Sequence, residues 1–389
     1  MLSSWPDGGP KLKWSATDLG AGFSSISQSG DRLVTLGTEG QNCLAICLNA
    51  KDGSTIWKRV IGETATDKGY NTGWGGGPRS SPTISGDRVY VLSDLGQLAA
   101  LRLSSGDPIW TVDLVGELGG KIPTWGYSAS PLIDGDRVVI GVGGKSFLIA
   151  LNKDTGNTLL RSSGSDEDDG SIDGAEYVSV MKHTVHGKSL YICASRSGLM
   201  GFDVESMKRT FHAPATGNRV AVIPTPICVD DLIYHTSAYG AGCQLVRVLP
   251  DGKTRIEYAK NNQTMENHHG GTVLVDNVIY GFSKQMGGGW MAHDFESGQN
   301  LWNERIRGVR SGSIAYADGL LYCYNANAGK LLLVRPNREK FELVGDLTIP
   351  RQSKMNRKRG KIWAHPVVSN GTLYLRDLDL LFAFDISGS

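Results

Sequence analysis

The chain has 389 residues, of which 40% are hydrophobic and 20% charged, and its formal net charge is +1. This composition is typical of a soluble globular protein with a large buried core. The near-neutral charge argues against a nucleic-acid binder and against a protein held at a membrane surface, and no apolar run is long enough to span a bilayer.

The first predicted element is a strand within residues 10–19, and residues 1–6 before it carry no signal-peptide pattern. The strand mirrors residues 107–114, because Trp14 stands where that segment has Trp110. The N-terminal strand therefore matches the last strand of a unit that recurs along the chain.

The clearest copy of this unit is residues 78–114, which has a hairpin turn at Gly86-Asp87 and another turn at 104–107. Short apolar, β-branched runs predict four strands, at 80–84, 88–92, 97–103 and 109–114. A single sheet of this kind cannot bury both of its faces, so it needs copies of itself as neighbours.

The copies are present, and they make eight units in all. They lie at residues 21–61, 78–114, 125–163, 176–214, 218–259, 267–305, 308–347 and 361–389. A period of about 45–50 residues with four strands per unit is typical of propeller blades. The last unit stops at Phe384-Asp385, short of an outer strand, so residues 9–19 are expected to complete it and close the ring. We predict one all-β domain over 1–389, an eight-bladed β-propeller with four-stranded antiparallel blades.

The repeated motif also resembles a known family. Each unit has a GDRVY-like strand, a strand of small residues and Leu, and a D-x-x-(T/S)-G turn, often followed after four residues by Trp, as in Gly106 and Trp110. This pattern resembles the PQQ-like repeat of the quinoprotein alcohol dehydrogenase-like superfamily, over essentially the whole chain. Four short motifs resemble compact bacterial PQQ-binding-like β-propeller repeat proteins: residues 125–128, 223–226, 267–271 and 363–366. The resemblance implies the eight-bladed fold and a periplasmic or secreted protein.

The six cysteines are expected to be buried packing residues. Cys47 occupies the small position of the third strand, where other units have Ala100 or Ala150. Cys43 and Cys47 have a C-x₃-C spacing, but no second Cys or His pair stands near them, so zinc is the weaker interpretation. The vicinal cysteine pair found in the family's large dehydrogenases is not present in this sequence.

Residues just before each inner strand should converge at one end of the central channel. The set is unusually polar and aromatic, and we take it as the candidate funnel site: Arg79, Trp125, Tyr127, Glu176, Arg219, His268, His269, Arg310, Trp363 and His365. Such residues favour a polar or anionic ligand. The alternative is that they tie neighbouring blades together.

His268-His269-Gly270-Gly271 is the sharpest local motif. Only one of two adjacent side chains on a strand can face the channel, and the two glycines allow a close backbone approach. A metal site that includes His365 is an alternative, although the spacing fixes no carboxylate partner, and we predict none.

Two charged segments stand out between units. Residues 165–176 are acidic and partly match an EF-hand loop, but flanking helices are implausible, so we interpret them as a solvated loop. Residues 351–361, RQSKMNRKRGK, form a basic loop that could attract an anionic partner.

Three functions remain open. The first is a monomeric propeller that binds a ligand or a protein partner at its funnel or rim without catalysis. The second is a PQQ-dependent alcohol or sugar dehydrogenase, which would need Ca²⁺ held by Glu, Asn and Asp, and Arg for the quinone. The third is a partner-binding scaffold that resembles the outer-membrane assembly lipoprotein. No G-x-S-x-G, H-E-x-x-H or Walker A motif indicates another chemistry.

Overall fold

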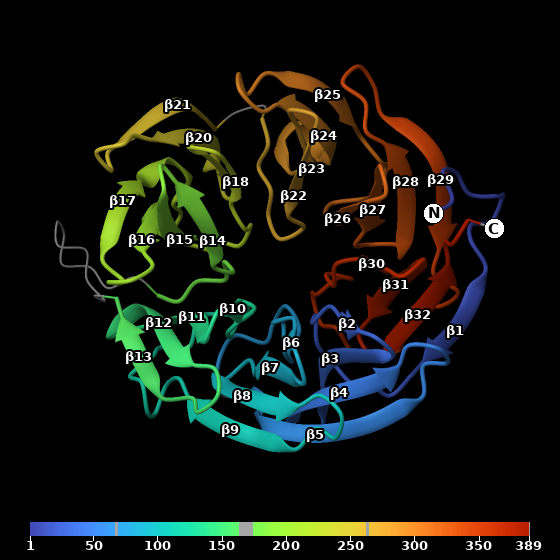
Figure 1. Cartoon of the computed structure of the whole chain (residues 1–389). Coiled ribbons are helices and arrows are strands. Elements are labelled where there is room, and N and C mark those ends of the chain that lie inside the picture. Colours follow the sequence, from blue (N-terminus) through green and yellow to red (C-terminus); the bar gives the residue numbers. More distant parts are fainter. Residues whose placement is uncertain (67–68, 163–173, 262–263, 389) are drawn as a thin grey trace.

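The computed structural model describes residues 1–66, 69–162, 174–261 and 264–388. The predicted acidic loop spans residues 165–176, and most of it lies within residues 163–173, outside the described residues. Within the described part, 32 strands form eight four-stranded antiparallel sheets, arranged as a ring around a central axis (Figure 1). The predicted all-β, eight-bladed propeller is confirmed.

Blades 1 to 4 follow one another along the chain, each running from the innermost to the outermost strand. Blade 1 has β2 (Ser27–Ser29), β3 (Arg32–Glu39), β4 (Asn42–Asn49) and β5 (Thr55–Glu63). Blade 2 has β6 (Thr83–Ser85), β7 (Arg88–Leu92), β8 (Gln97–Arg102) and β9 (Pro108–Asp113). Blade 3 has β10 (Leu132–Asp134), β11 (Arg137–Gly143), β12 (Ser146–Asn152) and β13 (Thr158–Arg161). Blade 4 has β14 (Met181–Val185), β15 (Lys188–Ser195), β16 (Gly198–Asp203) and β17 (Arg209–Ala213).

Blades 5 to 8 complete the ring, and two 3₁₀ turns, η1 (Pro214–Thr216) and η2 (Gln285–Gly287), lie among them. Blade 5 has β18 (Ile227–Val229), β19 (Leu232–Ser237), β20 (Gly242–Val248) and β21 (Thr254–Lys260). Blade 6 has β22 (Thr272–Val275), β23 (Val278–Ser283), β24 (Gly289–Asp294) and β25 (Asn300–Glu304). Blade 7 has β26 (Gly312–Ala317), β27 (Leu320–Asn325), β28 (Lys330–Arg335) and β29 (Glu342–Thr348). Blade 8 has β30 (Val367–Ser369), β31 (Thr372–Asp377), β32 (Leu380–Asp385) and, as its outer strand, β1 (Leu12–Ala16).

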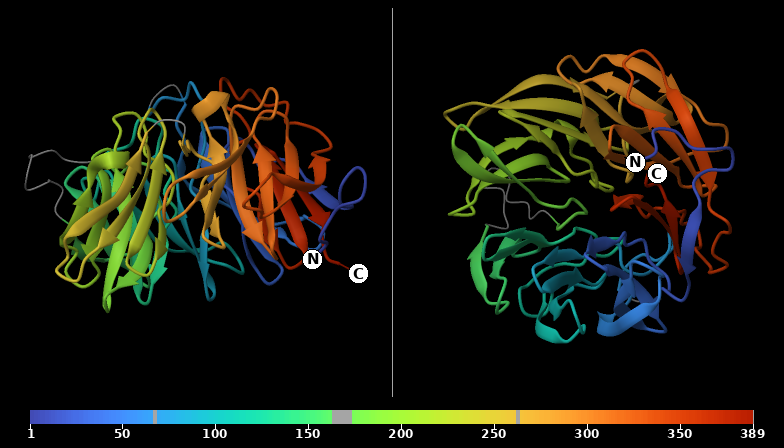
Figure 2. Two further views of the ribbon diagram at one scale, coloured as in Figure 1. Left: turned by 90° about the horizontal axis from the view of Figure 1, so that it is seen from above. Right: turned by 45° about the vertical axis from the view of Figure 1, so that its right-hand side comes forward.

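The two ends of the chain meet in blade 8. Strand β1 pairs antiparallel with β32, and Trp14 lies opposite Ala383, as the mirrored sequence predicts. The views in Figure 2 place both termini beside this blade. Closure in this way leaves no sheet open at the seam of the ring.

The recurring tryptophan has a defined place in the blade. It stands on the outer strand just after a β-bulge, directly opposite the small residue of the third strand, so the large ring fits over a small neighbour. The pairs are Trp57 with Cys47, Trp110 with Ala100, Trp302 with Ala292 and Trp14 with Ala383. Each indole N–H then donates to a backbone carbonyl oxygen of the next blade, at the turn between its third and outer strands. Trp110 Nε1, for example, is 2.9 Å from the Lys153 oxygen. The motif therefore packs one blade against the next.

Blade 7 departs from this pattern, because Gly345 stands after the bulge where six other blades have an aromatic residue and blade 3 has Leu160. The gap is filled by Trp5 from the segment before β1. Trp5 is buried, its backbone N–H donates to the Val344 oxygen, and its ring lies 6.1 Å from the ring of Tyr322. The spacing matches that of Trp110 and Tyr90 within blade 2, at 6.0 Å. Trp5 thus supplies from outside the repeat the aromatic ring that blade 7 does not have.

Because every blade is an up-and-down meander, two kinds of connection lie at the same end of the ring. These are the loops from each outer strand to the next inner strand, and the turns between the second and third strands. We call this end the mouth face. The other turns, for example 186–187 and 318–319, lie on the opposite face.

Candidate functional site

The centre of the mouth face is built from rings that blades 6, 8 and 1 contribute. His268 and His269 stack with ring centroids 4.2 Å apart, and His269 lies 4.6 Å from the ring of Trp363. Trp363 in turn packs on Phe23, with 5.1 Å between centroids. Loops from three blades that are far apart in sequence therefore form one continuous aromatic surface.

Tyr239, on the β19–β20 turn of blade 5, extends this surface. Its hydroxyl oxygen is 2.6 Å from Nε2 of His268, and the two rings meet edge to face at 5.0 Å. The ammonium group of Lys284, on the β23–β24 turn, lies 5.1 Å from the centre of the Tyr239 ring, within range of a cation–π contact. Tyr239 adopts a positive φ of 62°, which is unusual for a residue other than glycine and holds its ring out from the turn.

The imidazoles at this centre are held neutral. Burial, followed by the charge of Lys284, lowers the pKa of His268 to about 3. Burial, with the neighbouring His268, holds the pKa of His269 well below its ordinary value. Burial also lowers the pKa of His365. At neutral pH the surface therefore presents uncharged rings, which stack and exchange hydrogen bonds without repelling cations nearby.

The metal interpretation of the histidines does not fit. Nε2 of His365 is 3.0 Å from the carbonyl oxygen of His269 and is engaged there. In the part of the chain that is described, no group of three or more His, Cys, Asp or Glu side chains could hold a metal ion.

The two glycines after the histidines serve packing between blades. A Cβ on Gly270 would lie 1.7 Å from the carbonyl oxygen of Gly312, and the Ile314 N–H donates to the Gly270 oxygen at 3.1 Å. The close backbone approach expected from the sequence is therefore an approach to strand β26 of blade 7. Gly270 sets the inner strand of blade 6 against the next blade and so fixes the position of His268 and His269.

Arg79 supports the loop that carries it. Its guanidinium lies between the rings of Phe23 and Tyr70, at 5.2 and 5.3 Å from their centres. It also donates to the Gly75 oxygen at 2.7 Å and to the Gly77 oxygen at 3.0 Å. This side chain is occupied within the protein, and it holds Phe23 in line with Trp363.

Three further predicted residues make contacts within the blades. The Tyr127 hydroxyl is buried and donates to the Val142 oxygen at 2.8 Å. Glu176 is buried and pairs with Arg196 at 3.0 Å. Trp125 packs on Tyr177 at 5.9 Å, while its indole nitrogen is buried without a partner in the described residues. These three side chains therefore contribute to packing within the blades rather than presenting polar groups to the mouth.

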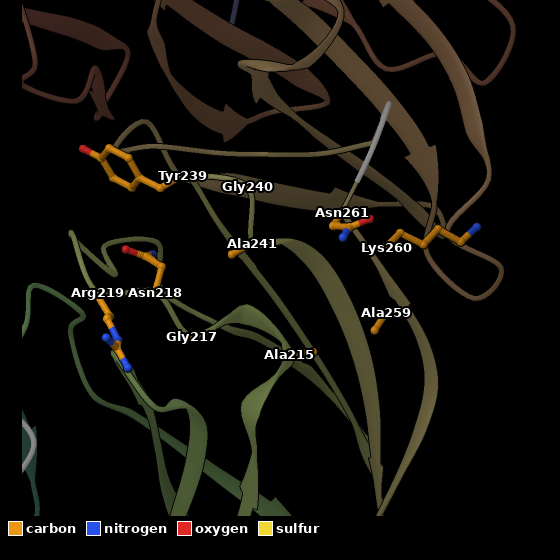
Figure 3. Close-up of a pocket in the computed structure, with 10 residues that line it drawn as sticks. All are labelled: Ala215, Gly217, Asn218, Arg219, Tyr239, Gly240, Ala241, Ala259, Lys260 and Asn261. Carbon is orange, nitrogen blue, oxygen red and sulfur yellow. The ribbon is translucent and has the colours of Figure 1, made fainter. Parts of the chain in front are cut away.

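Arg219 and Arg310 are the predicted cations that remain exposed, and neither guanidinium has a partner among the described residues. Arg219 borders an open groove of about 530 Å³ at the mouth-face end of blade 5 (Figure 3). The groove is lined by residues after β17, on the β19–β20 turn and at the end of β21: Ala215, Gly217, Asn218, Arg219, Tyr239, Gly240, Ala241, Ala259, Lys260 and Asn261. In Figure 3, Tyr239 and Arg219 lie at one end of the groove and Lys260 at the other. Tyr239 therefore joins this groove to the histidines at the centre.

The sequence set took only residues that precede inner strands, and so it omitted Tyr239 and Lys284. Both lie on turns between the second and third strands, which reach the same face. An aromatic and a cation at positions where turns usually carry Gly or Asp were the available signals.

A quinone–calcium site does not fit the described residues. The buried carboxylates of the mouth face have separate partners: one oxygen of Asp94 accepts from Thr64 and Tyr70, while the other has no partner in the described residues, and Asp377 pairs with Arg357. Glu266 accepts from the backbone of Gly240 at 3.1 Å and from Gln285. Among the described residues, no three carboxylates converge as a Ca²⁺ site would require.

Comparison with known proteins gives a family and a fold. A family model described as outer membrane protein assembly factor BamB matches residues 41–339. A search of curated proteins found no match.

Several solved structures are similar over 97% of the chain, each with a TM-score of 0.65. BamB from Moraxella catarrhalis is 15% identical and matched over 98% of its own chain. The computationally designed Ika8 protein is 10% identical and matched over its full length. The quinohemoprotein alcohol dehydrogenase from Comamonas testosteroni is 12% identical and matched over 77%. At these identities the structural similarity is one of fold.

Proposed function

The chain belongs to the family described as outer membrane protein assembly factor BamB, and from this membership we propose that it is a non-catalytic protein that binds a partner protein through its mouth face. The observation that carries this proposal is the aromatic and imidazole surface from Tyr239 through His268 and His269 to Trp363. Aromatic side chains around a neutral centre are the residues that interfaces favour, because large rings bury much area at little entropic cost.

The surroundings of this surface support an interface more than a small-molecule pocket. Trp74, Val220, Tyr239 and Met355 are large apolar side chains that the structure leaves exposed, and all four lie on mouth-face loops or turns. The groove beside Tyr239 is open to solvent, whereas a small-ligand site buries most of its ligand. A small anionic ligand at Arg219 is the alternative that the same experiments distinguish.

We also propose that the protein works as a monomer outside the cytoplasm, where the family's described role in outer membrane assembly takes place. One chain closes its own ring, so no second copy is needed to complete a blade. The six cysteines form no disulfide among the described residues, and burial raises the pKa of the Cys228 thiol to about 12 and that of Cys47 to about 11, so these thiols react poorly in any compartment.

Photo-cross-linking tests the proposed face. Tyr239 on the mouth face and Tyr316 at the opposite end of blade 7 are exposed to 42% and 44%, so they make a matched pair. Each is replaced by benzoylphenylalanine in the cells that make the protein, and adducts are identified by mass spectrometry. A discrete protein adduct formed from position 239 and not from position 316 is expected. Adducts from position 316 alone, or from neither position, would contradict the proposal.

The dehydrogenase alternative predicts a different result. Because the buried carboxylates are already engaged, adding PQQ and Ca²⁺ should give no saturable change in absorbance and no dye-linked oxidation of alcohols or sugars. Stoichiometric binding with turnover would replace our proposal by that of a quinoprotein. Binding without turnover would show that the mouth takes a small ligand.

A further inference from the structure

Two connections on the mouth face carry an unusual concentration of positive charge. Residues 305–310 lead into blade 7 and residues 351–361 lead towards blade 8, and neither segment contains Asp or Glu. Eight of their cationic side chains are exposed: Arg305, Arg307, Arg310, Arg351, Lys354, Lys358, Arg359 and Lys361. The whole chain has a net charge of only +1, so this charge is a local feature. We call these eight residues the basic arc.

The cations of the basic arc have no carboxylate partners within the described residues. None of the eight forms an ion pair within the described residues, although arginines elsewhere do, such as Arg137 with Glu205 and Arg247 with Asp231. Arg357, in the middle of the second segment, shows the contrast. It pairs with the buried carboxylate of Asp377 at 2.9 Å. One arginine therefore anchors the segment, and its neighbours are left to face solvent.

The two segments lie next to each other. The β27–β28 turn contacts the end of the first segment and the residue that follows the second: the Arg310 N–H donates to the side-chain oxygen of Asn327, and the Ile362 N–H donates to the Ala326 oxygen at 2.9 Å. At the far end, the Lys358 ammonium donates to the Thr72 hydroxyl at 2.8 Å. The basic arc thus runs along the mouth face from blade 7 to the loop before blade 2.

Apolar anchors stand within the arc. Trp74 is 43% exposed and lies under the guanidinium of Arg359, at 5.9 Å, and Met355 is 38% exposed. Trp363, in the loop that carries the second segment, belongs to the central aromatic surface. The arc therefore combines unpaired cations with large apolar side chains, which is the composition of a protein-binding surface.

We propose that the basic arc binds an acidic, apolar-containing segment of a partner protein, whose carboxylates pair with the free arginines and lysines and whose apolar residues pack on Trp74 and Met355. Bringing many like charges together without partners costs folding free energy, and a complementary acidic segment removes that cost. Nucleic acid is the less suitable class, because such binders usually carry a high net charge, which this chain does not have. The inference rests on the proposed function only in taking the partner to be a protein that binds this face.

The test uses the full chain and a fluorescent peptide rich in Glu, Asp and Phe, with a Gln/Asn version of the same peptide as the uncharged comparison. The variant is Arg307→Glu with Lys354→Glu, one reversal in each segment. The matched control is Lys188→Glu with Lys208→Glu, which makes the same charge change at exposed positions of the opposite face. All four side chains are exposed and none forms a salt bridge within the described residues, so the melting temperature should change little.

We expect the acidic peptide to bind, the arc variant to bind about tenfold more weakly, and the control to bind as the parent does. Raising the salt from about 50 to about 300 mM should weaken parent binding and remove most of the difference between variants. Equal binding by both variants, or no preference for the acidic over the uncharged peptide, would overturn the inference. Tighter binding of oligothymidylate or of phosphatidylglycerol vesicles would overturn it in favour of that class.

This outcome is separable from that of the proposed function. If the adduct at position 239 persists in the arc variant at parental yield, the mouth binds its partner without the arc, and only the inference falls. If neither the parent nor the arc variant forms the adduct at position 239, while the acidic peptide still binds the basic arc, only the proposed function is contradicted.

Discussion

Histidine burial is the most telling feature at the scale of single residues. His293 is fully buried in blade 6, and neither of its ring nitrogens has a partner in the described residues. Burial lowers its pKa from 6.5 to about 3, and His235 is similarly lowered to about 4. These groups stay neutral in the folded protein at pH values where the unfolded chain binds protons.

The stability of the protein should therefore fall in mild acid. Below the unfolded pKa of 6.5 the unfolded state takes up protons that the folded state refuses, so the free energy of unfolding decreases until the folded pKa is reached. For one histidine such as His293, the loss between neutral pH and about pH 5 is about 2 kcal/mol. Denaturant unfolding at several pH values measures it.

His293→Leu isolates one of these groups. Leucine removes two unsatisfied buried nitrogens, so the variant should be at least as stable as the parent at about pH 8 and lose about 2 kcal/mol less on acidification. A variant that is destabilised at pH 8 and keeps the parent's full acid sensitivity would show that the ring is neither buried nor unpaired as described.

The sequence predicted which residues reach the mouth face more reliably than what their side chains do there. The order of strands identifies residues that precede inner strands, so His268, His269 and Trp363 could be placed from the repeat. Sequence could not show that Tyr127 turns inward to Val142, or that Arg79 is held between two rings. These depend on packing between residues that the repeat does not align.

At the scale of elements, the segment before β1 completes blade 7. Trp5→Ala should destabilise the protein by about 3 kcal/mol, because it empties a buried site that packs on Tyr322. Gly345→Tyr alone should also destabilise, since a Cβ at Gly345 would lie 2.8 Å from the Cβ of Trp5.

The double variant tests whether the two positions share one site. Blade 5 has Tyr258 opposite Leu245, and blade 7 has Gly345 opposite Leu333, so a tyrosine at 345 has a precedent. Gly345 is not among the glycines with positive φ, so a side chain causes no backbone strain. Trp5→Ala with Gly345→Tyr should be more stable than either single variant, measured by chemical unfolding. Additive losses would show that Trp5 does not occupy the missing aromatic site.

The strand boundaries could be predicted from the turn residues, whereas the aromatic replacement in blade 7 could not. Short turns rich in Gly, Asp and Asn, such as Gly86-Asp87, Asp318-Gly319 and Asn370-Gly371, separate the apolar runs, and so the strands could be predicted. Trp5 lies outside the repeat and more than 300 residues from Gly345, as their numbering shows. Nothing local in either segment indicates the other, and only closure of the ring brings them together.

At the scale of the whole molecule, closure of the ring determines which residues meet on the mouth face. The unfinished last unit predicted that β1 would enter blade 8, and the structure confirms it. Closure places the loops of blade 8 beside those of blades 1 and 2, so Trp363 meets Phe23 and Arg359 meets Trp74. Closure therefore adds Phe23 to the aromatic surface and Trp74 to the basic arc.

Hydrogen exchange of the whole chain, with and without the partner captured at position 239, tests the central claim most directly. We predict that bound partner slows exchange in the mouth-face segments 214–222, 238–241, 266–271 and 357–366, and leaves the turns at 186–187 and 318–319 unchanged. Protection confined to those opposite turns or to the outer strands, with the mouth face exchanging as in the free protein, would contradict a function based on this face.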